Sequence, residues 1–146
     1  MATSVVKRIV RALPALRLLW RAPYLPSTAL RATDQYGDQG PFGYYQITRR
    51  SDGAAVGGIG FVGPPDGGMI EIGYGLIPAA RGHGYAGEAL FALMAIADEH
   101  GIAGFRADTT RDNIASQRTL AHTGFEQVAA GDELLHYEVR LMSRLA

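Results

Sequence analysis

A glycine-rich turn at residues 81–86, with the sequence RGHGYA, has the residue types and spacing best suited to chemistry. Gly82, Gly84 and Gly87 form a G-x-G-x-x-G string that runs into an apolar helical pattern. At such a helix start, unpaired backbone N–H groups and the helix dipole favour anions, and glycine lets a ligand approach the backbone. The turn therefore predicts a phosphate site, and the class of phosphate compound decides the function.

Two common phosphate ligands fit the surrounding sequence poorly. A dinucleotide fingerprint needs its first glycine directly after a buried strand, whereas PAAR separates the strand from Gly82. Asp108 is placed like the ribose-binding acid of that fingerprint, but the flanking hairpins do not belong to a parallel dinucleotide fold. A nucleoside-triphosphate loop needs Lys-Ser or Lys-Thr after the glycines, and the only lysine of the chain is Lys7.

An acyl-carrying coenzyme fits better, because the sequence here resembles the GNAT superfamily of acyl-CoA-dependent N-acyltransferases. The likeness is strongest to the Rim-type branch, whose members acetylate protein N-termini. The family's pyrophosphate loop reads Arg/Gln-x-x-Gly-x-Gly/Ala, and residues 81–86 match it. The Rim-type helix start stands as GYAGEAL at 84–90, with N-x-x-S at 113–116 and GF at 124–125. Several ordered motifs at matching spacing make this resemblance specific over about residues 42–141.

The resemblance implies that acetyl-CoA (coenzyme A) is the cofactor, with its pyrophosphate at the amides of the turn. The pantetheine arm would lie along the strand that ends in GYGLIP (73–78), where an N–H would hold the thioester oxygen as charge develops on it. Ordinary core packing is the alternative for this strand, and a helix N-cap is the local role of Asn113. The expected cofactor-binding residues are Leu76, Ile77, Arg81, Gly82, His83, Gly84, Tyr85, Ala86, Asn113 and Ser116.

Glu71 and Ser116 are the candidate catalytic residues for direct attack of a neutral amine on the thioester. Glu71 stands among glycines on the open face of its strand and could take the amine proton, although a solvated carboxylate is the equal alternative. Leu120 occupies the position of the tyrosine that protonates the thiolate in many relatives, so Ser116 is either a substitute donor or a packing residue. His136 and Tyr137 are weaker candidates that would border the acceptor site.

Composition limits the other classes of function. The chain has 146 residues, no cysteine and four histidines without metal-ligand spacing, so no metal site is expected. Its 47% hydrophobic and 19% charged residues are typical of one soluble domain. Apolar runs are too short for a membrane span, aromatic and basic residues do not interleave as in nucleic-acid binders, and a cytoplasmic location is expected.

Residue patterns predict an α+β fold with a mixed, mostly antiparallel sheet of about six strands. The GNAT resemblance implies that this sheet is splayed at a central parallel pair and covered by helices on both faces. Turn residues and apolar periodicity set the boundaries of the elements. Strands are expected at 43–50, 54–63, 69–77, 104–110, 125–130 and 133–142, and helices at 84–99 and 113–123.

The first 33 residues differ from the rest in charge. They carry six basic residues and no acidic ones, against eight basic and 14 acidic residues in 34–146. We expect 1–33 to be a helical segment, with an amphipathic helix at 4–13 and a second stretch to Trp20, beside a single GNAT domain at 34–146. GNAT proteins usually place a strand and two helices here to wall the acceptor pocket. The wall is therefore abbreviated or completed by a second chain, as in a homodimer.

The expected function is acetyl-CoA-dependent N-acetyltransfer to a primary amine in a ternary complex. A protein N-terminal α-amine and a small-molecule amine are both open as acceptors. The alternative is a GNAT-fold sensor or pseudoenzyme that binds coenzyme A without turnover, which Leu120 and the short head favour. A nucleic-acid-binding module led by the basic head is a third, weaker hypothesis.

Overall fold

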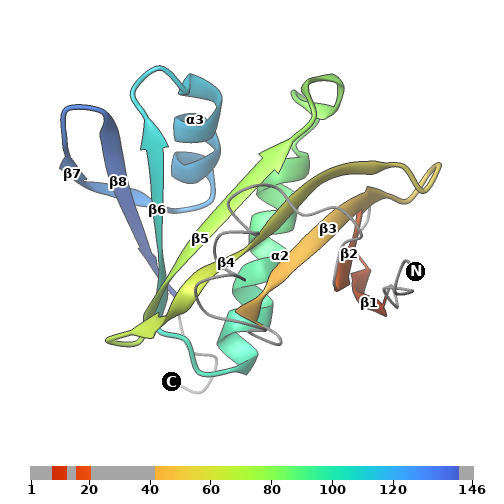
Figure 1. Cartoon of the computed structure of the whole chain (residues 1–146), viewed down its shortest axis with the longest axis horizontal. Helices are drawn as coiled ribbons and strands as arrows, with labels where there is room; N and C mark the ends of the chain where they lie inside the picture. The colour runs from red at the N-terminus through yellow and green to blue at the C-terminus, as the bar shows by residue number, and fades with distance from the viewer. Residues whose placement is uncertain (1–7, 13–15, 21–41, 142–146) are drawn as a thin grey trace, which may run out of the picture.

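Eight strands of the chain form one mixed sheet in the order β1-β2-β3-β4-β5-β6-β8-β7 (Figure 1). This computed structural model describes residues 8–12, 16–20 and 42–141. The strands are β1 (Arg8–Ala12), β2 (Leu16–Trp20), β3 (Tyr44–Arg49), β4 (Ala55–Asp66), β5 (Met69–Leu76), β6 (Gly104–Thr110), β7 (Glu126–Ala130) and β8 (Leu134–Arg140). The helices are α2 (Tyr85–Glu99), α3 (Ile114–His122) and a short 3-10 turn, η2 (Pro78–Ala80).

The α+β fold expected from the sequence is confirmed, and every element predicted between residues 43 and 140 is present. The largest difference between a predicted and an observed boundary is at the end of β4. This strand continues to Asp66, and a tight turn then leads into β5. Helix α2 ends at Glu99 with His100 as its C-cap, and Gly101 follows with a left-handed φ of 75°, as its sequence position predicted.

The helical expectation for the N-terminal segment is wrong for the residues that the structure describes there. Residues 8–12 and 16–20 are the strands β1 and β2, which pair with each other, and β2 pairs with β3 from Leu16↔Arg49 to Trp20↔Tyr45. Pairing to β3 satisfies backbone groups that an edge strand would expose, and this non-local gain outweighs a local apolar spacing that suits a helix. The remainder of 1–33, and its boundary with 34–146, lies outside the described residues.

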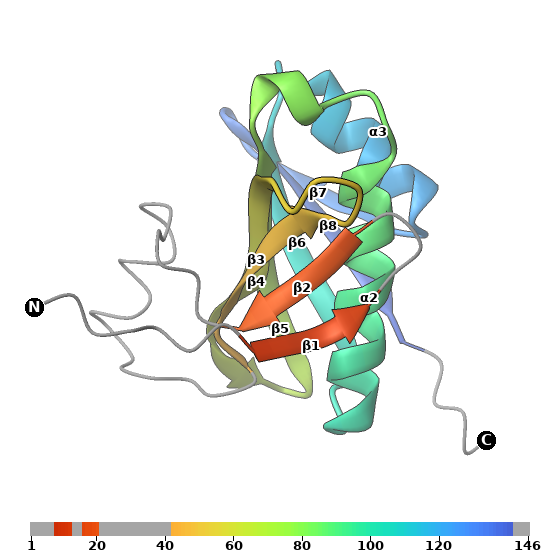
Figure 2. The ribbon, with the colours of Figure 1, turned by 90° about the vertical axis from the view of Figure 1, so that its right-hand side faces the viewer.

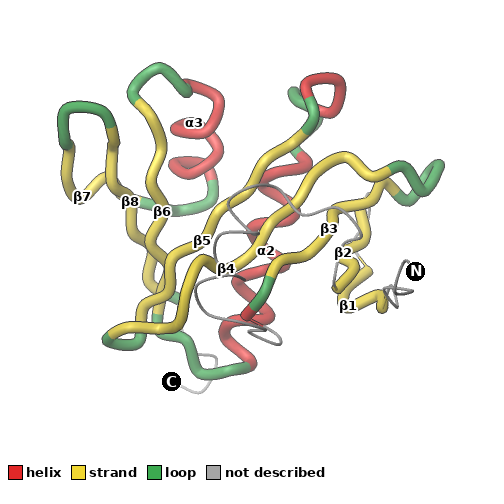
Figure 3. The backbone as a smooth tube through the Cα atoms, viewed as in Figure 1, coloured by secondary structure: helices red, strands yellow, loops and turns green. Residues whose placement is uncertain are grey.

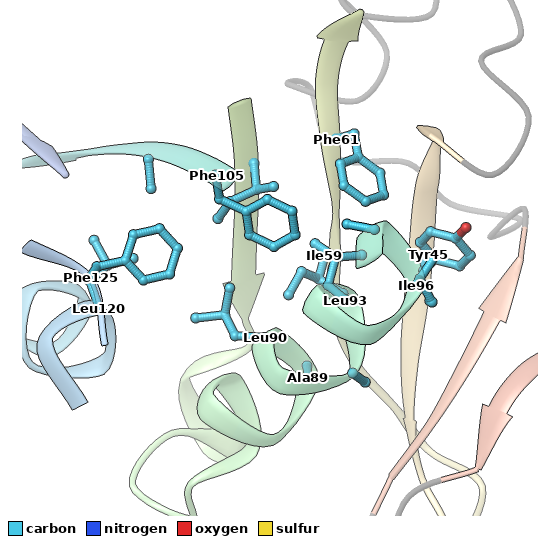
Figure 4. Packing of buried hydrophobic residues seen from close by; sticks show 14 of the residues in the cluster. Tyr45, Ile59, Phe61, Ala89, Leu90, Leu93, Ile96, Phe105, Leu120 and Phe125 are labelled. Atoms are coloured by element: carbon cyan, nitrogen blue, oxygen red, sulfur yellow. The ribbon is translucent and has the colours of Figure 1, made fainter. Parts of the chain in front are cut away.

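Both described helices lie on the same face of the sheet, which Figure 2 shows from the side, and α2 crosses behind the central strands in the view of Figure 1. Cover on both faces was expected, and the described residues supply it on one. The core lies between α2 and the sheet, where Leu90, Leu93 and Ile96 point toward Phe105 and Ile59 (Figure 4). On the other face, the described residues place no helix over β3, β4 and β5.

The sheet divides at its one parallel pair, β5 and β6. These strands are paired only at Met69↔Gly104, Ile70↔Phe105 and Glu71↔Arg106. Beyond Glu71 they diverge, and α3 follows β6 on the far side of the gap (Figure 3). One edge of β5 from Ile72 onward is therefore unpaired, while its other edge remains paired with β4 as far as Leu76. The splay implied by the family resemblance is confirmed.

Helix α2 supplies a direct test of where the core lies. Leu93 is fully buried, whereas Phe91, two residues earlier, is 54% exposed. We expect Leu93→Ala to lower the free energy of unfolding by about 2–5 kcal/mol, because it leaves a cavity against the sheet. Phe91→Ala, the matched control on the same helix, should change it by roughly 0.5 kcal/mol or less. Urea titration followed by circular dichroism measures both, and equal losses would contradict this packing.

Candidate active site

A cleft of about 690 Å³ opens where β5 and β6 separate. Its lining comes from β3, β4, β5 and β6, and from the start of α3. Of the residues singled out in the sequence, the cleft brings together Glu71, Leu76, Ile77, Asn113 and Ser116. These residues come from β5, from the start of α3 and from the loop positions beside them, so only the fold could place them together.

Glycines form the floor of the cleft on the open face of the sheet. Gly58 lies opposite Gly75, and Gly60 lies opposite Gly73, on the paired strands β4 and β5. A Cβ atom added at Gly75 would meet no atom within 4 Å, and one at Gly73 would meet only Val62 Cγ2, at 3.6 Å. Among the described residues, the space above Gly75 is therefore open, whereas Tyr44 covers Gly58 and Gly60 on the neighbouring strand.

Two carboxylates stand at the β6 side of the cleft. Glu71, at the last paired position of β5, has its pKa raised by burial and, secondarily, by the charge of Asp108, while Arg106 lowers it. The Asp108 carboxylate is in turn 2.6 Å from His136 Nδ1 on β8. A carboxyl group whose pKa is raised is better suited to exchange protons near neutral pH.

The Asp108–His136 pair is a feature of the site that sequence reasoning missed. Asp108 was considered only as a ribose ligand, and His136 only as a neighbour of the acceptor site. The pairing follows from the register Asp108↔His136 between β6 and β8, which no local pattern indicates. Tyr137 faces the other way, is 7% exposed and belongs to the core.

A hydroxyl pair lines the α3 side of the cleft. Tyr74 Oη lies 2.9 Å from Ser116 Oγ and donates to the Ser116 carbonyl oxygen at 3.3 Å. Asn113 accepts from the Ser116 N–H at 3.1 Å, so it is the N-cap of α3 as predicted. Burial raises the pKa of Tyr74. The sequence gave no signal that the Tyr74 hydroxyl reaches α3.

Leu120, at the position of the usual tyrosine, is fully buried in the core. It offers no polar group to the cleft. Tyr74 places a phenol hydroxyl in the cleft instead. This hydroxyl comes from strand β5 and not from helix α3, which carries Leu120.

The turn at 81–86 lies just beyond the Leu76 end of the cleft and does not line it. Gly82 and Gly84 have left-handed φ values of 82° and 76°, and His83 stacks on Tyr85 with ring centroids 5.4 Å apart. Gly84 is the N-cap of α2, and its carbonyl accepts from Glu88 N, so the amides of residues 85–87 have no acceptor within the helix. These amides form the positive end of a 15-residue helix.

Two expected cofactor contacts are already used within the chain. Arg81 Nε donates to the Leu76 carbonyl at 3.3 Å, which joins the turn to the end of β5. The Ile77 N–H donates to the Val56 carbonyl at 2.9 Å. Because the Leu76 carbonyl bonds to Arg81 rather than to β4, the backbone of Leu76 is turned toward the gap, whereas the N–H of Ile77 is not free for a ligand.

A metal site and a membrane-spanning helix are both absent from the described residues. No group of three or more His, Asp or Glu side chains among them could hold a metal ion. In the same part of the chain, neither helix has the length and apolar character that crossing a membrane requires.

Comparison with known proteins identifies the family that this chain matches. Residues 13–126 match the family described as "Acetyltransferase (GNAT) domain". Over 86 residues the chain is 37% identical to an uncharacterized N-acetyltransferase, YjdG, of Bacillus subtilis (strain 168), in a match covering 58% of this chain and 51% of that protein. The match thus spans about half the length of that relative.

Solved structures share the fold. RimL, a ribosomal L7/L12 alpha-N-protein acetyltransferase, aligns with a TM-score of 0.67 and 22% identity over 92% of this chain and 98% of its own. The microcin C7 self immunity acetyltransferase MccE, solved in complex with acetyl-CoA and AMP, aligns with a TM-score of 0.70 and 16% identity over 88% and 93%.

The electrostatics of the cleft can be measured on Glu71 itself. Because the Asp108 charge raises the pKa of Glu71 and Arg106 lowers it, we expect Asp108→Asn to shift that pKa downward and Arg106→Gln to shift it upward. Titration of the Glu71 carboxyl carbon by NMR measures the pKa of Glu71 in the wild type and in both variants. Glu126→Gln, on the exposed strand β7, is the control and should leave the titration unchanged. Shifts of the opposite sign would show that Glu71 does not sense these two groups.

Proposed function

The chain belongs to the GNAT acetyltransferase domain family, and we propose that it is an acetyl-CoA-dependent N-acetyltransferase that acetylates a primary amine. The observation that carries this proposal is the gap between β5 and β6, with a helix N-terminus at one end and a carboxylate of raised pKa at the other. The gap has room for a thioester. Its helix end favours an anion such as the pyrophosphate, and its carboxylate end can accept a proton from the amine.

The cofactor would bind along the unpaired edge of β5. In this proposal the amides of residues 85–87 bind the pyrophosphate, within the turn formed by Arg81, Gly82, His83, Gly84, Tyr85 and Ala86. The pantetheine arm enters the gap beside Leu76 and Ile77 and reaches Asn113 and Ser116 on α3. Arg81 acts through the backbone, since its guanidinium holds the end of β5 in place.

The chemistry is divided between the two sides of the cleft. Acetyl-CoA supplies the thioester carbonyl that the amine attacks. Glu71 accepts the proton that the amine loses, directly or through a water, and Leu76 N–H holds the carbonyl oxygen as it becomes negative. The Tyr74–Ser116 pair returns a proton to the departing thiolate. An α-amine, with a reference pKa of about 7.7–8.0, needs less help from Glu71 than a lysine amine at about 10.4.

A coenzyme A-binding sensor is the competing hypothesis, and Leu120 was its main support. The Tyr74 hydroxyl weakens it, because a proton donor stands in the cleft without the usual tyrosine. The two are separated by incubating the chain with acetyl-CoA and a pool of amines and measuring free thiol. Thiol release that depends on an amine supports the enzyme. Calorimetric binding of coenzyme A without thiol release supports the sensor, and no binding overturns both.

Glu71→Gln tests the base. We expect kcat/KM of the wild-type chain to rise with pH as Glu71 loses its proton. In the variant this pH-dependent rise should be absent, and the rate should fall by about 10²–10⁴-fold. The pH profile of amine-dependent thiol release measures it, with Glu126→Gln as the control. An unchanged profile in Glu71→Gln would exclude Glu71 as the base.

Gly84→Ala tests the pyrophosphate site. The left-handed φ of 76° at Gly84 makes alanine strained by about 1–2 kcal/mol, and relaxation of the turn should move the amides and weaken coenzyme A binding at least tenfold. Gly101, at the other end of α2, has a φ of 75° and equally open surroundings. Gly101→Ala should therefore lose similar stability and keep its affinity. Equal affinity of the two variants in calorimetry would place the pyrophosphate elsewhere.

A further inference from the structure

Asp108 on β6 is a carboxylate that lines the cleft and has no direct part in the mechanism above. Its Oδ1 atom lies 2.6 Å from His136 Nδ1, and the described residues make no other hydrogen bond to its side chain. An ionised carboxylate only accepts hydrogen bonds, so the histidine donates through Nδ1. The second oxygen of Asp108 keeps its capacity to accept, and it is available to a ligand in the cleft.

Contacts behind Asp108 hold this carboxylate in one position. His136 lies opposite Asp108 in the register between β6 and β8. Its ring borders the β7–β8 turn, where a Cβ atom added at Gly131 would lie 3.9 Å from His136 Nε2. The Arg111 guanidinium in turn donates to the Gly131 carbonyl at 2.6 and 3.1 Å. Arg111 thus fixes the turn beside His136, and His136 fixes Asp108, which is the arrangement of a preorganised binding group.

The charge of Asp108 has no counterion among the described residues that line the cleft. Glu71 is also acidic, and none of these lining residues is a lysine, arginine or histidine. Arg106, two residues before Asp108 on β6, lies 3.5 Å from Glu138. His136 compensates the carboxylate only when its ring is protonated. The β6 wall of the cleft therefore attracts cationic groups and repels anionic ones.

Strand register sets the separation of Asp108 from Glu71. Both side chains lie on the same face of the sheet, and Asp108 follows the last rung, Glu71↔Arg106, by two residues. One strand spacing of about 4.8 Å and two residues of about 3.3 Å each place the two Cα atoms about 8 Å apart where the strands diverge. The nitrogens of an extended 1,5-diaminopentane are about 7–8 Å apart. The separation therefore suits two cationic groups joined by one extended chain.

The rest of the cleft suits the alkyl chain of such an acceptor. Its floor on β5 is the backbone of Gly73 and Gly75, and the space above Gly75 is open. On the side away from β6, the Tyr44 ring covers Gly58 and Gly60 and gives the cleft an aromatic wall. Aromatic rings pack well against alkyl chains and attract ammonium groups. The aromatic wall and the carboxylate wall thus favour the same chemistry.

We propose that Asp108 determines acceptor specificity: its carboxylate, held by His136, pairs with a second cationic group of the acceptor while the reacting amine lies beside Glu71. The acceptor class is an extended aliphatic amine that carries an additional positive charge. This inference rests on the proposed acetyltransfer, since it assigns the reacting amine to the same cleft. Asp108 binds the acceptor, and His136 is a positioning residue that acts through Asp108.

Three acceptors of equal length test the sign of the carboxylate wall. Pentylamine, 1,5-diaminopentane and 5-aminopentanoate share one primary amine and differ in the far group, which is neutral, cationic or anionic. After correction for its two equivalent amines, the diamine should have a wild-type kcat/KM at least about tenfold above that of pentylamine. The value for 5-aminopentanoate should be the lowest. Amine-dependent thiol release at one fixed pH measures all three.

Variants of Asp108 are compared by the ratio of kcat/KM for the diamine to kcat/KM for pentylamine. Because both acceptors meet the same variant, an effect of the substitution on Glu71 or on acetyl-CoA cancels in this ratio. Asp108→Asn keeps the size of the side chain and removes its charge, so the ratio should fall to the statistical factor for two equivalent amines. Asp108→Glu keeps the charge and should keep the preference for the diamine. Glu126→Gln removes one negative charge from the exposed strand β7 and should leave the ratio unchanged.

His136→Phe tests positioning, because it keeps an aromatic ring and removes the Nδ1 donor. The ratio should fall part of the way towards that of Asp108→Asn. In the double variant it should equal the ratio of Asp108→Asn alone, since His136 acts only through Asp108. If the pair is merely structural, both single variants will have lower melting temperatures and a wild-type ratio, which would contradict the inference.

The remaining outcomes separate the inference from the proposed function. If the wild type acetylates pentylamine as well as the diamine, or acetylates other amines and neither of these, Asp108 does not bind a second cation. If Asp108→Asn keeps the preference for the diamine, another group recognises its charge. The inference is overturned in each of these cases, and the proposed acetyltransfer stands. If the wild type acetylates no amine at all, the proposed function fails and the inference fails with it.

Discussion

The brief pairing of β5 with β6 is the constraint on which the rest of the molecule depends. Three rungs, from Met69 to Glu71, join the two halves of the sheet, and pairing stops there. Without those rungs the halves would not share a core, and with more of them the edge of β5 would be covered. The cleft exists because β5 keeps pairing with β4 while it leaves β6.

The same constraint arranges the chemistry. Glu71 stands at the last joined rung beside Asp108, and partial loss of solvent together with the charge of Asp108 raises its pKa there. Tyr74 lies further along the freed part of the strand and reaches across to Ser116. Arg81 then fastens the end of β5 to the turn before α2. Glu71, the hydroxyl pair and the helix N-terminus are thus spaced along a single strand, which fixes their order beside any ligand bound at its edge.

Much of this could be predicted from the sequence, because local patterns are strong between residues 43 and 140. Alternation on β5, the apolar face of α2 and the glycine that ends it are all local signals, and the structure has each of them. What failed was non-local. The pairing of β2 with β3 overrode an apparent helix, and the contacts Asp108–His136 and Tyr74–Ser116 depend on register and on the position of α3.

The bare backbone floor of the cleft has a consequence for how this protein can change over time. Gly75 has ordinary φ, and a methyl group there would touch nothing within 4 Å, so alanine is sterically available without rearrangement. Each added carbon at that position would make the channel shallower while the sheet beneath stayed intact. The depth of the cleft is therefore adjustable in single-carbon steps at Gly75, separately from the residues that hold the fold together.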